Sequence, residues 1–143
     1  MRKIERIIIH CTAASSSQKT DDIIAYWRKK GWASNGYHWL ISESGIAERL
    51  QGDGFISNGV KGHNSTAINI CYKGGWNKKD TRTPEQKETL LFLIQDYKIN
   101  YPDAIVLGHR DLSPDLDGDG VIEKQEWLKI CPCFDAGAEY KDL

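Results

Sequence analysis

The segment from Gly108 to Asp135 constrains this chain most, because it interleaves two kinds of metal-binding residue. His109 near its start and Cys131 and Cys133 near its end are ligands of the type that bind zinc. Between them lies an acidic run of the type that binds hard cations through oxygen atoms. A histidine and one thiolate are too few to complete a zinc site. The segment therefore predicts a fold in which the upstream chain supplies the missing ligand.

The acidic run over 115–126, DLDGDGVIEKQE, has the residue spacing of an EF-hand calcium loop. The pattern assigns four side-chain ligands and one backbone carbonyl ligand, and these are Asp115, Asp117, Asp119, Glu126 and the carbonyl of Val121. The alternative is a solvated acidic loop that holds no ion. Ser113 and Pro114 stand where an EF-hand has its entering helix, and the sequence contains no second loop of this kind. The pattern thus predicts a single structural calcium site and not a paired calcium sensor.

Composition and hydropathy argue against two classes of partner. A formal net charge of -1 over 143 residues gives no electrostatic reason to expect binding to nucleic acid or to an anionic membrane. The sequence has no apolar run of about 18 residues that could cross a membrane, and residues 7–9 are too short for the apolar core of a signal peptide. We therefore expect one domain over residues 1–143, a monomer made in the cytoplasm, with reduced thiols.

The order of apolar segments predicts an α/β fold with a mixed central sheet flanked by helices. Residues 6–10 form a buried strand, with His10 at the carboxyl end, where an open α/β sheet places its ligands. The other expected elements are a helix capped by Thr20, a hairpin of strands 37–41 and 46–49, a long loop over 52–65, a strand over 67–72, a helix beginning at the capping box 83–86 and a strand over 104–107.

Taken together, several motifs give the chain a family resemblance. They are IIIHCTAA at 7–14, GWASNGYHWLI at 31–41, GHNSTAINICYKGG at 62–75, TPEQ at 83–86, GHRDLSP at 108–114 and KICPCFD at 129–135. In this order and spacing they resemble the zinc-dependent N-acetylmuramoyl-L-alanine amidases, most of all the small amidase-type lysozymes of bacteriophages. That fold is shared with peptidoglycan recognition proteins. The acidic loop over 115–126 departs from the resemblance, because it looks like an insertion between the last two motifs.

The resemblance implies that His10, His109 and Cys131 bind a catalytic zinc ion, with water in the fourth position. Cys133 is the rival thiolate ligand, but the cysteine of the family immediately precedes the proline. The neighbouring Cys11 should point to the opposite face of its strand and join the core.

Tyr37 and Lys129 match the catalytic positions of the family. In the mechanism that the resemblance implies, a zinc-activated water attacks the lactyl carbonyl that joins muramic acid to L-alanine in bacterial peptidoglycan. Lys129 would stabilise the oxyanion, and Tyr37 would orient the water or pass a proton to the departing amine. His38 should face away from Tyr37 and be structural. His63 and Asn64, in the long loop, are candidate substrate contacts.

Two other functions compete with this interpretation. A peptidoglycan-binding module of the same fold would hold the substrate without cleaving it, but such modules typically lack the zinc cysteine, which this chain retains. A calcium-regulated interaction protein would need paired loops. We therefore expect a phage or prophage endolysin that acts at the cell wall after its release.

Overall fold

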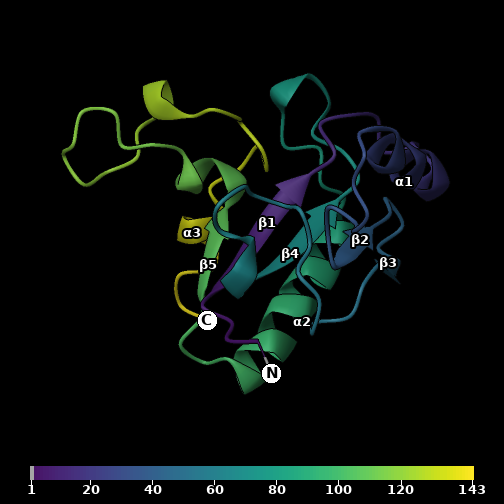
Figure 1. Ribbon diagram of the computed structural model, residues 1–143, viewed down its shortest axis with the longest axis horizontal. Helices are drawn as coiled ribbons and strands as arrows, with labels where there is room; N and C mark the ends of the chain where they lie inside the picture. Colours follow the sequence, from purple (N-terminus) through teal and green to yellow (C-terminus); the bar gives the residue numbers. More distant parts are fainter. Residues whose placement is uncertain (1) are drawn as a thin grey trace.

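The computed structural model describes residues 2–143 as a five-stranded sheet with helices on both faces (Figure 1). The strands lie in the order β3-β2-β4-β1-β5, and all neighbours run parallel except β2 and β3, which form an antiparallel hairpin. The bounds are β1 Arg6–Cys11, α1 Thr20–Lys29, β2 Trp39–Ile41, β3 Ala47–Arg49, β4 Ala67–Tyr72, α2 Pro84–Asn100, β5 Ile105–Gly108 and α3 Ala136–Glu139. This mixed sheet confirms the predicted fold class. Over the described part of the chain, no helix combines the length and the apolar character needed to cross a membrane.

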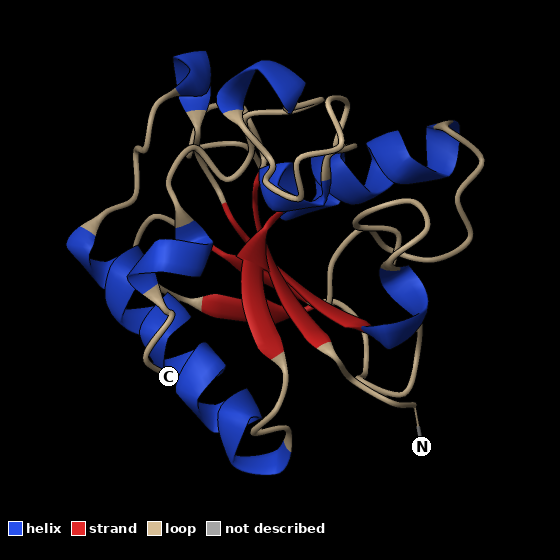
Figure 2. Ribbon diagram, turned by 90° about the vertical axis from the view of Figure 1, so that its left-hand side faces the viewer, coloured by secondary structure: helices blue, strands red, loops and turns tan. Residues whose placement is uncertain are grey.

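The two faces of the sheet pack against different helices (Figure 2). The larger core cluster joins β1 and β4 to α2 and includes Ile9 and Ile94. On the other face, Ile23 and Trp27 of α1 pack with Leu40 of β2. Because side chains alternate along a strand, neighbouring residues of β1 point to opposite layers. The sheet thus presents one strand face to α2 and the other to the layer that contains α1.

The capping box predicted for the second helix is present, whereas the cap predicted for the first is wrong. Thr83 Oγ1 accepts a hydrogen bond from the backbone N–H of Gln86 at 3.1 Å, and the Gln86 side chain accepts one from the Thr83 N–H at 3.0 Å. In α1 the capping residue is Lys19, and Thr20 is already helical. The Thr20 hydroxyl donates to Glu48 Oε1 at 2.6 Å. The Thr20 hydroxyl therefore makes a tertiary hydrogen bond to β3 and does not cap the helix.

A buried arginine attaches the C-terminal segment to the α2 side of the molecule. The Arg82 side chain is 2% exposed, and it donates to Asp80 at 2.9 Å and to Glu139 at 2.8 Å. Its guanidinium also lies 3.3 Å from the centroid of the Phe134 ring. Phe134 and Tyr140 belong to the larger core cluster. These contacts hold residues 134–140 against the core, a few residues after the predicted zinc ligand Cys131.

Candidate active site

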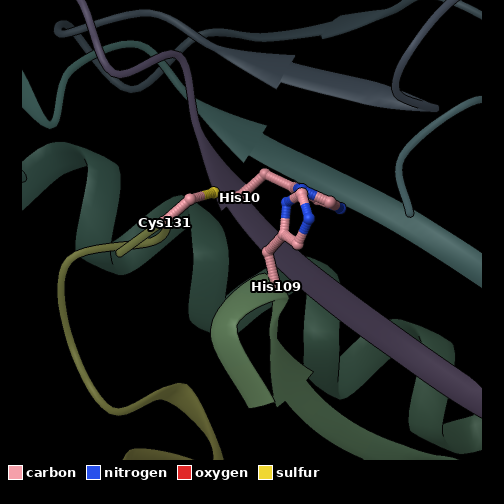
Figure 3. A group of neighbouring side chains, drawn as sticks. All are labelled: His10, His109 and Cys131. Atoms are coloured by element: carbon pink, nitrogen blue, oxygen red, sulfur yellow. The ribbon is translucent and has the colours of Figure 1, made fainter. Parts of the chain in front are cut away.

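His10, His109 and Cys131 come together at one edge of the sheet (Figure 3). His10 lies near the carboxyl end of β1, and His109 directly follows β5, the parallel neighbour of β1. One ligand atom from each residue lies within 4.8 Å of those of the other two. Among residues 2–143, the group contains only these three side chains. Three ligands with one open position is the composition of a catalytic zinc centre, whereas structural centres use four protein ligands.

Backbone contacts fix Cys131 at the end of β1. The N–H of Cys11 donates to Cys131 Sγ at 3.1 Å, and the N–H of Arg110 donates to the Cys131 carbonyl at 2.9 Å. The segment also passes very close to β5: a Cβ atom added to Gly108 would lie 2.7 Å from Cδ of Pro132. Glycine at the end of β5 therefore allows the thiol to approach the two histidines.

Burial keeps both imidazoles neutral at pH 7. The pKa of His10, which is 1% exposed, is lowered to about 3 by burial and then by the neighbouring His109. The pKa of His109 is lowered to about 4, again mainly by burial and then by the charge of Lys129. The two ring centroids are 5.0 Å apart. A neutral imidazole offers a lone pair to a metal, so the chemistry of the site fits the ion that the family resemblance implies.

Asn69 determines which nitrogen of His10 is free to bind a metal. The Asn69 Oδ1 atom lies 2.8 Å from His10 Nε2. Because an amide oxygen only accepts, Nε2 carries the proton and Nδ1 keeps the lone pair. Asn69 is paired with Ile8 in the β1-β4 register, so its side chain lies on the same face as that of His10. A Cβ atom on Gly59 would lie 2.2 Å from Asn69 Oδ1, so glycine there lets the loop close over the amide.

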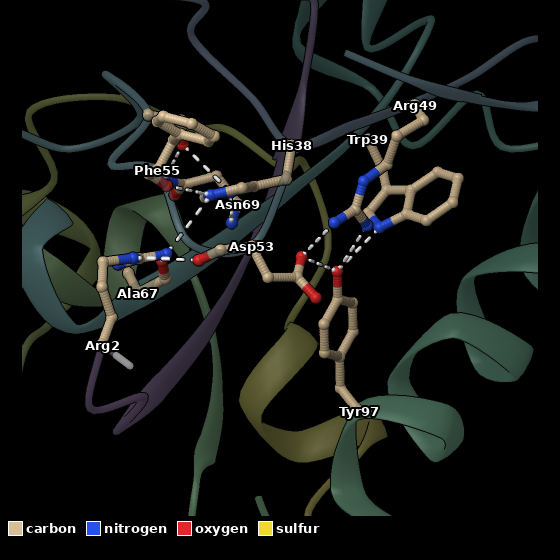
Figure 4. A network of polar contacts seen from close by, with 10 residues as sticks. Arg2, His38, Trp39, Arg49, Asp53, Phe55, Ala67, Asn69 and Tyr97 are labelled. Carbon is tan, nitrogen blue, oxygen red and sulfur yellow. Dashed lines mark hydrogen bonds and ion pairs between the residues drawn. The ribbon is translucent and has the colours of Figure 1, made fainter. Parts of the chain in front are cut away.

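A buried hydrogen-bond network, the Asn69 network, holds this amide through Ser57 and His38. Figure 4 shows His38 beside Asn69 and Phe55. Asn69 Nδ2 donates to Ser57 Oγ at 2.7 Å, and the Asn69 backbone N–H donates to His38 Nδ1 at 3.0 Å. His38 Nε2 donates to the carbonyl of Phe55 at 2.8 Å. All three polar side chains are 0% exposed, and burial lowers the pKa of His38. His38 therefore has the structural position expected for it.

A cavity of about 430 Å³ opens beside the three ligands, and we call it the metal cavity. Its walls come from the segment after β1, from α1 and from the segment before α3. His109, Cys131, Tyr37 and Lys129 all line it. The structure thus brings both predicted catalytic residues to a cavity that two of the three predicted metal ligands, His109 and Cys131, also line.

Tyr37 and Lys129 approach the metal group in different ways. The Tyr37 ring lies 5.0 Å from the His10 ring and meets Trp27 of α1 edge-on at 5.4 Å. Burial, as the largest cause, raises the pKa of Tyr37 well above its usual value, so the phenol stays protonated at neutral pH. Lys129 is exposed at the cavity wall. The cavity therefore combines a neutral hydrogen-bond donor with an exposed cationic side chain.

Three other candidate residues lie outside the metal group and its cavity. Cys133 Sγ is 3.8 Å from Cys11 Sγ, and Cys11 is 4% exposed in the core on the α2 side, as predicted. His63 and Asn64 do not line the metal cavity. Asn64 Oδ1 instead accepts a hydrogen bond from the Val60 N–H at 2.8 Å, which organises the loop itself.

The acidic loop brings its four carboxylates together. One oxygen from each of Asp115, Asp117, Asp119 and Glu126 lies within 4.8 Å of the others. The three aspartates are exposed, but Glu126 is only 3% exposed and accepts from the N–H of Glu123 at 2.9 Å. A short 3-10 helix at 109–112 precedes the loop and another, at 124–126, forms its last three residues, in place of the paired α-helices of an EF-hand. The arrangement therefore shares its loop spacing, but not its helices, with an EF-hand.

Sequence reasoning missed the Asn69 network and the wall that α1 contributes. Asn69 is a polar residue between Ile68 and Ile70 in a fully buried strand. A polar residue within a buried apolar strand is an informative exception, so the position of Asn69 in the sequence could have marked it as a functional or structural polar contact. Ser57 gives no comparable signal, because its role depends on how the 52–65 loop folds back onto β4.

The fold and the site together define a class of protein. It has an open α/β sheet and a group of three possible metal ligands beside a cavity at the carboxyl ends of the parallel strands. The profile of the N-acetylmuramoyl-L-alanine amidase family matches residues 1–125. This range contains His10, Tyr37 and His109, and it ends before Lys129 and Cys131.

Individual relatives agree with this match. An uncharacterized protein of Haemophilus influenzae is 48% identical over 86 residues, which are 57% of this chain and 74% of that protein. The endolysin of Klebsiella phage KP32 is 28% identical over 94% of this chain and 83% of its own length. The amidase LysC of Clostridium intestinale has the same fold, with a TM-score of 0.76 at 21% identity over 96% of this chain and 82% of that one. The chain belongs to the N-acetylmuramoyl-L-alanine amidase family, and peptidoglycan amidase activity follows from that membership.

Proposed function

We propose that this protein is a zinc-dependent amidase that cleaves the bond between the lactyl group of N-acetylmuramic acid and L-alanine. The observation that carries the zinc dependence is the group of His10, His109 and Cys131, of which His109 and Cys131 line the metal cavity. Two neutral imidazoles and a thiol supply the nitrogen and sulfur ligands that zinc prefers. Zinc, when bound, supplies Lewis acidity and a water whose pKa falls towards about 7.

The side chains of the cavity have complementary roles in this proposal. Asn69 orients the His10 ring, so that Nδ1 faces the metal position. Lys129 carries the charge that stabilises the oxyanion formed when the lactyl carbonyl is attacked. Tyr37, protonated and fixed against Trp27, orients the attacking water or passes a proton to the departing alanine amine. His63 and Asn64 lie outside this cavity, so any contact they make with the substrate is to its more distant parts.

A non-catalytic peptidoglycan-binding module is the second candidate function. Such a module needs a groove but has no need for a complete set of zinc ligands. The presence of Cys131 within 4.8 Å of both histidine ligands favours the enzyme. Lys129 beside the same cavity is a further reason, because a cation there serves a developing negative charge.

The proposed site of action is the bacterial cell wall, reached after release from the cytoplasm, by a monomeric phage or prophage endolysin. The similarity to the endolysin of Klebsiella phage KP32 over most of both chains supports this proposal. The proposal requires no insertion into a membrane and no nucleic-acid partner, and the substrate is the peptidoglycan polymer itself.

We also propose a structural calcium ion in the 115–126 loop. The four carboxylates are close enough to share one cation, and the carbonyl of Val121 would add a fifth ligand. The Leu128 N–H donates to Ser113 Oγ at 3.1 Å, which closes the base of the loop immediately before Lys129. Calcium would therefore stabilise the segment that carries Lys129 and Cys131, because it would cancel the repulsion among the clustered carboxylates.

Digestion of purified peptidoglycan tests the proposed function. Amide hydrolysis should release new N-terminal alanine amines without new reducing sugar ends, and zinc removal should stop the release. New reducing ends would indicate a glycosidase instead. Binding to peptidoglycan with no release of amines by the zinc-loaded protein would favour the non-catalytic module.

A further inference from the structure

We infer that a second cavity, adjoining the metal cavity, binds the glycan strand of the substrate. This cavity, which we call the Trp76 cavity, has a volume of about 650 Å³ and is walled by Trp76, Trp127 and Leu128. It shares Ala13, Lys129 and Cys131 with the metal cavity. The inference rests on the proposed amidase function, and it assigns the two halves of the substrate to opposite sides of the metal group.

The Trp76 cavity has an aromatic and apolar part formed by Trp76, Trp127 and Leu128, and Lys78 and Lys129 also line its wall. Trp76 is 66% exposed and Leu128 is 75% exposed. Trp127 is held from one side by Arg110, whose guanidinium lies 4.0 Å from the ring. Exposed apolar side chains that gather beside a functional site commonly mark a binding surface.

The loop that carries Trp76 is held in a costly conformation. Asn77 and Lys78 both have left-handed backbone angles, with φ of 57° and 62°. The Gly75 N–H donates to Thr81 Oγ1 at 2.8 Å, and this hydrogen bond links the two ends of the loop. Non-glycine residues in this region are strained and concentrate at functional sites. The strain is therefore consistent with a loop whose task is to present the Trp76 indole.

A glycan suits this surface better than a peptide does. A pyranose ring is uncharged and has faces of C–H groups, which pack against the negative face of an aromatic ring. The side of the metal cavity formed by α1 differs, because Lys30 Nζ lies 4.2 Å from the Trp32 ring centroid and 5.4 Å from that of Tyr26. A cation held between two rings suits the carboxylates of the stem peptide. The scissile amide joins these two halves, and Cys131 of the metal group lines both cavities.

Binding of the two reaction products to the zinc-loaded protein tests this assignment without turnover. One probe is a short GlcNAc-MurNAc oligosaccharide from which the stem peptides have been removed, and the other is the free stem peptide. Calorimetric titrations would compare the parent with Trp76→Ala, Trp76→Phe and Phe92→Ala. Phe92 is a matched control, because it is also 66% exposed but lies on the outer face of α2.

Trp76→Ala should weaken glycan binding at least about tenfold, as expected for an exposed indole at the centre of a contact. Trp76→Phe should retain most of the affinity for the glycan, and Phe92→Ala should leave the affinity for both ligands unchanged. Stem-peptide affinity should stay the same in all three variants. The inference is overturned if the parent does not bind the oligosaccharide or if Trp76→Ala leaves that binding unchanged. It is also overturned if Trp76→Ala weakens binding of the stem peptide instead of the oligosaccharide. Release of alanine amines by the parent is scored separately, so a failed glycan assignment and a failed amidase are distinguishable.

Discussion

Replacing Asn69 by alanine should weaken zinc binding without removing any zinc ligand. The change deletes the acceptor of the His10 Nε2–H bond, which is 2.8 Å long and fully buried. His10 then loses the contact that fixes its tautomer and ring orientation. Loss of such an outer contact typically lowers metal affinity about 10- to 100-fold, which is about 1.4 to 2.8 kcal/mol. A buried donor left without a partner also costs about 1 to 3 kcal/mol of stability.

Two assays separate these effects. Competition with a zinc chelator gives the zinc affinity, and urea unfolding of the metal-free protein gives the stability. Nitrogen NMR shifts of His10 in the metal-free protein report its tautomer directly, and they should show Nε2 protonated in the parent and a mixture in the variant.

Gln86→Ala is the matched control for Asn69→Ala. Gln86 is another amide that is 0% exposed, and its Nε2 donates to the carbonyl of Lys73 at 2.9 Å, at the start of α2 and away from the metal group. Its replacement should destabilise the fold to a similar degree while zinc affinity stays at the parent value. If Asn69→Ala binds zinc as tightly as Gln86→Ala does, Asn69 does not orient His10 and the reasoning is wrong.

The remaining predictions concern the ligands, the catalytic side chains and the loop. Cys131→Ala should abolish both zinc binding and amine release while Cys133→Ala keeps both, and the reverse pattern would reassign the thiolate ligand. Lys129→Ala and Tyr37→Phe should keep the zinc content but lower kcat about 100- to 1,000-fold, and near-parent turnover in either would remove that residue from the mechanism. With zinc held constant, calcium at about 100 times its Kd should add about 2.7 kcal/mol of stability, seen as a higher Tm that Asp119→Ala loses. An unresponsive parent Tm would contradict the calcium proposal.

The strands and the second helix were predictable because their signals are local. The three isoleucines of β1 and the unbroken apolar run of β4 leave little choice but a buried strand. The capping box at Thr83 is equally local, and the helix begins where it predicts. Thr20 shows the limit of such patterns, because the Glu48 carboxylate that competes for its hydroxyl is distant in sequence.

The metal group could be predicted from motif order, but the residues around it could not. His10, His109 and Cys131 each belong to a recognisable motif, and the parallel register of β1 with β5 brings the two histidines together. Ser57 reaches Asn69 only because the long loop folds back over the sheet. That contact depends on tertiary structure, which spacing alone does not encode.

The most direct test of the account is a zinc titration of the metal-free protein with amine release measured at every step. Release of N-terminal alanine amines from peptidoglycan should rise linearly and level off at one zinc ion per chain. The same titration of His10→Ala should give no release at equimolar zinc. Full amine release by the metal-free parent, or by zinc-treated His10→Ala, would contradict the central claim that this chain is an amidase with its zinc at His10, His109 and Cys131.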